Sequence, residues 1–398
     1  MTTTVTSPTT EPAPVSGPVA VPDAGPLRRV LSVDALRGIT IAFMIMVNNN
    51  ATDRAWWFMK HAEWNGLTPT DLVFPTFLFL VGVSIVFAYE ARLSKGITRS
   101  ALAWQTVRRA AILFCFGLIV NSFPYFNFHT MRIYGVLQRI AVCYLIAGLL
   151  YLWDSKWQSK AAVLVSALIG YWIIMRWVPV PGLGVPTHEI PLLDKDANLV
   201  AWLDRHLLPG RLYEGTRDPE GLLSDLPALG TALFGVLAGI WLRSKHTLRG
   251  KAAGIAGGAA ASIAIGCLWS IWFPLNKKLW TSSYVLVAAG VALALLALLF
   301  WAIEVQGWKG KWTWPALVFG SNAIAAYMIS ELLGSALDLI GGWLNGGHPF
   351  NPTRWFYIHC LAWIPNGGLA SFAYSFCYMA VCFIPIWILY RKKIFLKV

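Results

Sequence analysis

Apolar residues occur along the chain in ten blocks of about 20 residues, separated by polar or charged connections. A hydrocarbon layer about 30 Å thick is spanned by about 20 helical residues. Blocks of this length therefore predict membrane-spanning helices, at 31–50, 70–90, 107–123, 134–152, 161–178, 224–242, 252–273, 281–303, 315–340 and 367–390. We expect an all-α, polytopic membrane protein with about ten transmembrane helices.

Basic residues are concentrated in alternate connections, which predicts the orientation. Short cytoplasmic loops carry an excess of Lys and Arg. The basic connections contain Arg28, Arg29, Arg92, Lys95, Arg99, Arg108, Arg109, Lys156, Lys160, Arg243, Lys245, Arg249, Lys251, Lys309, Lys311, Arg391, Lys392, Lys393 and Lys397. This distribution predicts that the N- and C-termini are both cytoplasmic.

The segments outside the blocks suggest one membrane domain with a tail. Residues 1–27 are rich in Thr, Pro, Val and Ser and have no apolar core. We expect a disordered cytoplasmic tail there, not a cleaved signal peptide. Residues 28–398 form the membrane domain. Its long outer connections, 179–223 and 341–366, could cover an outward-facing pocket.

Composition supports the membrane assignment. The 398 residues are 57% hydrophobic and 13% charged, against about 25% charged in soluble proteins. The net charge of +13 follows from the basic loops, and no nucleic-acid-binding motif accompanies it. Walker A, GxGxxG, HExxH and GxSxG patterns are absent, as are CxxC pairs and Cys/His clusters. We therefore expect no ATP-driven transport, serine hydrolysis, metal site or nucleic-acid partner.

Asp34 and Arg37 open the first block and are the first candidate polar group. Three residues apart on a helix, they share a face and can pair. One interpretation is an ion pair that anchors the membrane edge. In the other, Arg37 contacts donor phosphates, which guanidinium groups bind in a bidentate manner.

The second candidate group extends from Asn48 to Asp71. Three consecutive amides, Asn48 to Asn50, end an apolar helix, where they require water or a polar pocket. His61 follows, and imidazole is well suited to accept a proton near neutral pH. Asp71 either caps the next helix or orients the imidazole.

The third candidate is the pair Gln138 and Arg139 within the fourth block, where an arginine either reaches the interface or faces a polar cavity. Lys277, Asn322 and Glu331 are weaker candidates. Glu331 could simply hydrogen-bond to a neighbouring helix.

The order of several sequence blocks resembles the heparan-α-glucosaminide N-acetyltransferase family. The blocks are Ser32-Val33-Asp34-Ala35-Leu36-Arg37-Gly38, Val47-Asn48-Asn49, His61 to Pro75, Gly135-Val136-Leu137-Gln138-Arg139-Ile140, Asp218-Pro219-Glu220-Gly221-Leu222-Leu223, Asn276 to Tyr284, and Gly320-Ser321-Asn322-Ala323-Ile324. The resemblance spans about residues 30–335. It implies transfer of an acetyl group from cytosolic acetyl-CoA to a glucosamine across the membrane.

The resemblance also implies roles for the candidate residues. His61 matches the catalytic histidine, and Asn48 and Asp71 match residues of the active site. At the inner rim we expect acetyl-CoA to meet Asp34, Arg37, Arg108, Arg109, Gln138 and Arg139. For the acceptor we expect contacts from Asn49, Glu63, Trp64, Asn65, Lys277 and Asn322.

We therefore expect a multi-pass acetyltransferase of a bacterial inner membrane that acts on a periplasmic amino sugar or glycan. The resemblance does not include the large luminal domain of the animal enzyme, which favours a bacterial amino sugar over heparan. Alternatives are a secondary transporter of sugars or cell-wall fragments, a polysaccharide O-acyltransferase and a scaffold. Direct transfer and an acetyl-His61 intermediate both stay open, as do a monomer and a homodimer.

Overall fold

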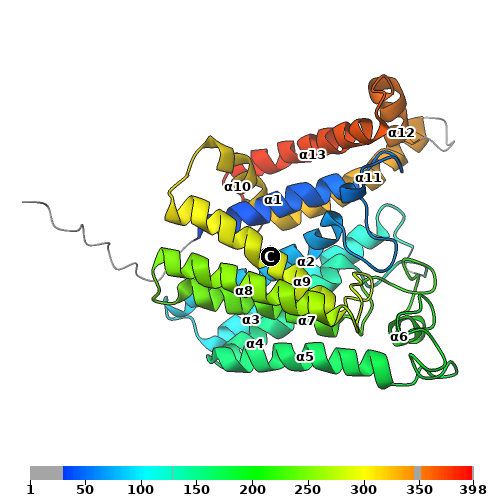
Figure 1. The fold of residues 1–398 in the computed structure, drawn as a ribbon. Coiled ribbons are helices and arrows are strands. Elements are labelled where there is room, and N and C mark those ends of the chain that lie inside the picture. Colours follow the sequence, from blue (N-terminus) through cyan, green and yellow to red (C-terminus); the bar gives the residue numbers. More distant parts are fainter. Residues whose placement is uncertain (1–29, 128, 345–350, 397–398) are drawn as a thin grey trace, which may run out of the picture.

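The computed structural model describes residues 30–127, 129–344 and 351–396, and these form a bundle of helices that lie side by side (Figure 1). Within these described residues, ten helices are long and apolar enough to cross a membrane, at the ten predicted positions. The described residues contain no β-strand, so the all-α prediction is confirmed. The elements are α1 Leu31–Asn48, η1 Trp57–Met59, η2 Pro69–Leu72, α2 Val73–Leu93, α3 Arg99–Ser122, α4 Val136–Trp153, α5 Trp157–Trp177, α6 Leu199–Leu207, α7 Asp225–Arg243, α8 Leu248–Trp269, α9 Ser282–Phe300, η3 Trp301–Val305, η4 Lys311–Thr313, α10 Trp314–Ser321, α11 Ala323–Leu344, α12 Pro352–Phe356, η5 Tyr357–Leu361 and α13 Gly367–Arg391.

The bundle has two distinct ends. We call the end where α1 begins and α13 finishes the tail end, on the left in Figure 1. The opposite end carries residues 49–72 and 178–224 and is called the loop end. Both outer limits of the described helices therefore lie at the same end, as an even number of spans requires. That this end is cytoplasmic stays a prediction, and the predicted tail, 1–27, lies outside the described residues.

Helix α3 begins earlier than the hydropathy pattern indicated. The sequence placed Arg108 and Arg109 in a connection, whereas α3 begins at Arg99 and includes both. The hydroxyl of Thr98 accepts a hydrogen bond from the Ala101 amide at 3.3 Å and caps the helix. Hydropathy detects the apolar part of a helix and misses a polar first turn, so the boundary was predicted too late.

The block predicted at 315–340 is interrupted. Helix α10 ends at Ser321, and α11 begins at Ala323. Between them, Asn322 has a non-helical backbone (φ −135°, ψ 45°). Its side chain donates to the Ile394 carbonyl (3.0 Å) and accepts from the Leu396 amide (2.9 Å). These hydrogen bonds hold the end of the chain against the break.

Glycines allow neighbouring helices to approach each other closely. A Cβ atom on Gly38 would lie 1.7 Å from the carbonyl oxygen of Ala316 in α10, and one on Gly320 would lie 2.2 Å from a backbone oxygen of α1. Gly82 and Gly235 bring α2 and α7 together in the same manner, each 1.9 Å from a carbonyl oxygen of the other helix. Small residues at such crossings permit the backbone packing that stabilises helices in lipid.

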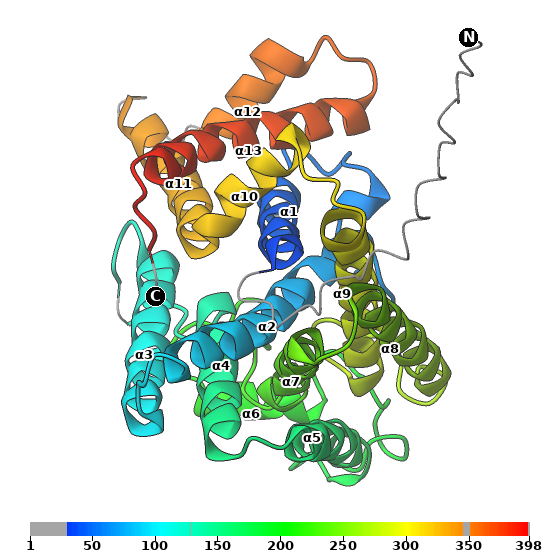
Figure 2. The ribbon, with the colours of Figure 1, turned by 90° about the vertical axis from the view of Figure 1, so that its left-hand side faces the viewer.

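The two long connections of the loop end contain helices. The connection predicted at 179–223 includes α6, and the one at 341–366 includes α12 and η5. Viewed from the tail end, α2 and α7 lie inside the bundle, with α5 at one border and α12 and α13 at the other (Figure 2). Helix α2 contributes residues to both of the polar cavities described next.

Candidate active site

The three consecutive asparagines at the end of α1 have different roles. The Asn49 amide donates to the Ile45 carbonyl (2.8 Å), and the Asn50 amide donates to the carbonyls of Val47 (3.1 Å) and Met59 (2.8 Å). These two therefore satisfy backbone acceptors at the helix end and in the loop behind it. Asn48 is exposed and, unlike the other two, lines the cavity beside His61.

Asp71 is buried and receives hydrogen bonds on both carboxylate oxygens. Oδ2 accepts from the Ala62 amide (3.0 Å), the Thr68 amide (3.1 Å) and the Thr68 hydroxyl (2.9 Å). Oδ1 lies 2.7 Å from Nδ1 of His61. Asp71 thus completes the capping box of η2, in which Thr68 is the N-cap, and also pairs with the histidine, so both interpretations of the sequence apply to it.

His61 is held by this carboxylate while its other face is open. The side chain of His61 is 44% exposed, against 1% for Asp71. Because an ionised carboxylate only accepts hydrogen bonds, Nδ1 carries the proton. The lone pair is therefore on Nε2, which is the nitrogen that can act as a base and which has Nζ of Lys277 3.4 Å away.

Lys277 completes the group from the connection between α8 and α9. Its Nζ lies 3.0 Å from Nδ1 and 3.4 Å from Nε2 of His61, and 3.8 Å from Oδ1 of Asp71. Burial lowers the pKa of Lys277, although the charge of Asp71 opposes that shift. Asn276 donates to Asn65 across the two loops (3.1 Å), which holds the lysine beside the histidine.

A cavity of about 420 Å³ opens beside these residues at the loop end. Its polar lining comes from several loops and helices: Asn48, His61, Thr70, Asp71, Arg132, Tyr213, Glu214, Glu220, Lys277, Lys278, Tyr327 and Glu331. We call it the His61 cavity. A pocket dense in ionisable groups is a candidate for chemistry.

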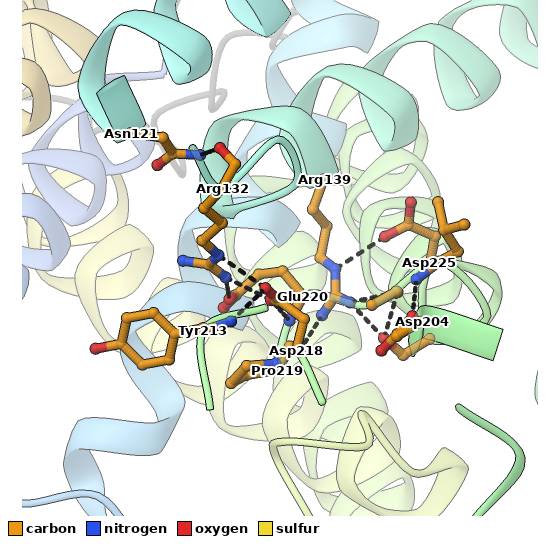
Figure 3. A network of polar contacts seen from close by, with 12 residues as sticks. Asn121, Arg132, Arg139, Asp204, Tyr213, Asp218, Pro219, Glu220 and Asp225 are labelled. Atoms are coloured by element: carbon orange, nitrogen blue, oxygen red, sulfur yellow. Dashed lines mark hydrogen bonds and ion pairs between the residues drawn. The ribbon is translucent and has the colours of Figure 1, made fainter. Parts of the chain in front are cut away.

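Arg132 pairs with acidic residues on one wall of this cavity (Figure 3). It lies 2.5 Å from Oδ1 of Asp218 and 2.5 Å from Oε2 of Glu220, and it stacks on Tyr213 with 4.6 Å to the ring centre. Burial alone would lower the pKa of Arg132, but the two carboxylates raise it. Sequence reasoning did not single out Arg132 or Glu220, although Glu220 lies in one of the family-like blocks.

Arg139 holds the loop that carries Glu220 (Figure 3). Fully buried, it pairs with Asp225 (2.9 Å) and donates to the carbonyls of Pro219 (3.2 Å) and Gly221 (3.0 Å). Gln138 is also buried, and its amide has no hydrogen-bond partner among the described residues. Neither residue lines the cavity of the tail end, where we expected both to meet the donor.

A second cavity of about 510 Å³ opens at the tail end. Its polar and basic lining consists of Arg37, Ser84, Tyr89, Arg92, Lys95, Arg109, Tyr144, Ser321 and Asn322. We call it the Arg37 cavity. Arg37 donates to Ser84 (2.7 Å) and pairs with Asp34 (3.1 Å). Arg109 lines it as expected, whereas its neighbour Arg108 is exposed and does not; Arg92 and Lys95 were missed.

The two cavities lie between the same helices, α2 and α11; we call the region between these helices the seam. On α2, Phe77 lines the Arg37 cavity and Phe74 lines the His61 cavity. Three helical residues correspond to a rise of about 4.5 Å. On α11, Ile324 lines the Arg37 cavity, and Tyr327, three residues later, lines the His61 cavity. The cavities are thus separated by about one helical turn along shared walls.

The expected acceptor residues are dispersed. Lys277 lines the His61 cavity, whereas Asn322 lines the Arg37 cavity. Asn49 lines a third, outer cavity of about 760 Å³, which shares Asn48 with the His61 cavity. Glu63, Trp64 and Asn65 are in the loop after His61 but outside its cavity; the Trp64 indole donates to the Leu193 carbonyl (2.8 Å). In the described part of the chain, no group of three or more His, Cys, Asp or Glu could hold a metal ion.

Comparisons with known proteins agree with the resemblance. Residues 29–272 match the family model described as heparan-alpha-glucosaminide N-acetyltransferase, catalytic. The heparan-alpha-glucosaminide N-acetyltransferase of Homo sapiens is 30% identical over 359 residues, covering 76% of this chain and 53% of that protein. The Mus musculus protein of the same name is 30% identical over 360 residues, covering 77% and 54%. The chain spans about half the length of these curated relatives.

Proposed function

Because the chain belongs to the heparan-α-glucosaminide N-acetyltransferase family, we propose that it is a multi-pass acetyltransferase of a bacterial inner membrane. It moves an acetyl group from cytoplasmic acetyl-CoA, bound at the tail end, to a periplasmic amino sugar or glycan at the loop end. One observation carries this proposal. The His61 cavity, which holds His61 and Asp71, and the basic Arg37 cavity lie between the same helices, about one helical turn apart.

The Arg37 cavity is suited to the phosphates of CoA. Its basic residues are Arg37, Arg92, Lys95 and Arg109, and guanidinium groups bind phosphate through charge-assisted hydrogen bonds. Charged groups do not cross the hydrocarbon layer without a large cost. The phosphates therefore stay at the tail end, and the seam between α2 and α11 leads the acetyl-bearing arm towards His61.

His61 acts as the general base in this proposal. Asp71 keeps the proton on Nδ1, so Nε2 accepts the proton of the acceptor amine. The amine nitrogen attacks the thioester carbonyl carbon, the C–S bond breaks, and the sulfur receives a proton. Asn48 and Lys277 line the cavity as donors that steady the oxyanion during the attack.

A covalent route uses the same residues. Nε2 of His61 attacks the thioester first, CoA leaves, and the acceptor amine then removes the acetyl group from the imidazole. Parallel lines in two-substrate kinetics, or acetyl label on His61 in the absence of acceptor, identify this route. Intersecting lines without label identify direct transfer.

Incubation of the purified protein with labelled acetyl-CoA and a panel of amino sugars tests the function, with mass spectrometry of the products. His61→Ala should lower transfer by about 10²–10⁴-fold. His206→Ala is the matched control, because His206 is exposed on α6 and lines neither cavity. Full transfer by His61→Ala contradicts the proposal.

Two other functions give different results in the same preparation. A polysaccharide O-acyltransferase forms ester products that mild base cleaves, whereas amides resist it. A secondary transporter moves sugar across vesicles at a rate that does not depend on acetyl-CoA. Either result without N-acetylated product replaces the proposal.

A further inference from the structure

We infer that Glu331 binds the ammonium group of the acceptor and thereby selects amines over hydroxyls. This inference rests on the proposed function of the His61 cavity and adds the residue that recognises the acceptor. Glu331 lines that cavity from α11, together with Tyr327 one turn earlier. It comes from a helix that supplies neither the histidine nor its carboxylate partner.

The charges around the cavity leave Glu331 as the exception. Four carboxylates line it, and three have cationic partners. Asp71 pairs with His61 at 2.7 Å and has Lys277 3.8 Å away.

The second and third carboxylates, Glu214 and Glu220, are paired as well. Glu214 pairs with Lys278 at 2.7 Å and with Arg217 at 2.6 Å. Glu220 pairs with Arg132 at 2.5 Å. Each of these three acids therefore has a cationic partner within 3.8 Å, although Glu220 shares Arg132 with Asp218.

Glu331 makes no ion pair with any described residue. Its Oε1 lies 3.4 Å from the Nδ2 donor of Asn48, a long contact with a neutral amide. A carboxylate within a membrane-spanning helix is costly unless a partner compensates for its charge. In the proposed reaction the acceptor supplies that partner, since an amino sugar is largely protonated near neutral pH.

The chemistry also requires a group that holds the amine before it reacts. The substrate arrives as an ammonium ion, which has no lone pair and cannot attack. One proton passes from the nitrogen to Nε2 of His61, and the remaining N–H groups stay hydrogen-bonded to Glu331. The nitrogen then forms the C–N bond as the C–S bond breaks. A second proton moves from nitrogen to the thiolate, which gives the amide, the thiol and a protonated histidine.

A hydroxyl acceptor lacks the charge that Glu331 would pair with. Hydrogen bonds to charged groups contribute about 1.5–3 kcal/mol, or about 10–150-fold in affinity. Glu331 therefore predicts a preference of this order for an amino sugar over the sugar with a hydroxyl at the same carbon.

The test compares glucosamine and glucose as ligands of the full-length protein. Wild type should bind glucosamine about 10–150-fold more tightly than glucose. Glu331→Gln keeps the size of the side chain and its contact with Asn48, so it should abolish this preference and leave glucose affinity and the KM for acetyl-CoA unchanged. Asp338→Asn is the control, because Asp338 lies two turns further along α11 and lines the outer cavity instead.

The outcomes separate this inference from the proposed function. Acetyl transfer by wild type together with an intact amine preference in Glu331→Gln overturns the inference alone. Absence of transfer by wild type overturns the proposed function, and the binding comparison still decides whether Glu331 recognises the amine. Equal melting temperatures of wild type and variant establish that Glu331→Gln is folded; a variant that loses glucose binding as well has lost the cavity, and contradicts a specific role in amine recognition.

Discussion

Replacement of Asp71 by Asn tests the orientation of His61 most directly. In the wild type, Oδ2 accepts three hydrogen bonds from Ala62 and Thr68, while Oδ1 accepts one from His61. An asparagine preserves the three contacts only if its single oxygen takes the place of Oδ2. Its NH₂ group then faces the imidazole and forces Nδ1 to accept. The proton moves to Nε2, which can no longer act as the base.

The expected loss in kcat follows from this change of tautomer. The same error in a serine-protease triad lowers kcat about 10⁴-fold. His61 is more exposed than a triad histidine, so its ring can reorient, and we expect about 10²–10⁴-fold, equivalent to about 3–5.5 kcal/mol in activation free energy. The KM for acetyl-CoA should stay unchanged, because Asp71 does not line the Arg37 cavity.

The assay is steady-state transfer from labelled acetyl-CoA to the best acceptor of the panel. Asp53→Asn is the matched control, since Asp53 is an exposed acid in the same loop that lines the outer cavity and not the His61 cavity. A kcat within threefold of wild type for a folded Asp71→Asn would refute the assigned tautomer, and with it the role of His61 as base.

Two further predictions concern the tail end and the outer loop. Arg109→Gln should raise the KM for acetyl-CoA by about tenfold or more, because a charge-assisted contact is lost. Arg108→Gln should leave the KM unchanged, since Arg108 is exposed outside the cavity. Equal effects of the two substitutions in titrations of acetyl-CoA would contradict the assignment of the Arg37 cavity. Burial raises the pKa of Asp204 from 3.8 to about 7. The stability that this group contributes is therefore present below about pH 4 and is lost as the pH rises towards 7 and above. Asp204→Asn should flatten this decline in melting temperature between about pH 4 and 7, and a variant with an unchanged slope contradicts the assignment.

The membrane spans were predictable because lipid imposes one requirement on every span. Each must be helical and apolar over about 20 residues, and that pattern is local. Boundaries were less accessible, as at Arg99, where one hydroxyl of Thr98 begins α3 eight residues before the predicted start. The break at Asn322 depends on Ile394 and Leu396, more than 70 residues away. Hydropathy carries no information about such a contact.

In the site, too, contacts between residues close in sequence could be predicted, and contacts between distant residues could not. His61 and Asp71 are ten residues apart, and their pairing could be predicted from the short loop and the resemblance. Arg139 could not be placed, because an arginine in an apolar block indicates that a partner exists and not where it lies. Its partner Asp225 is 86 residues further along the chain. The pair of Arg132 and Glu220 depends on an equally distant contact, between residues 88 apart in the sequence.

The narrow separation of the two cavities has an electrical consequence. If acetyl transfer occurs across this single turn, an acyl cation moves outward from sulfur to nitrogen, while a proton moves inward from nitrogen to sulfur. The exchange carries no net charge, so the membrane potential, which would shift a charged transfer by about 2.3 kcal/mol per 100 mV, neither drives nor opposes it. The apolar side chains of Met44, Phe74 and Phe77 at that turn would then also serve as insulation, and a polar residue among them would open a leak for protons.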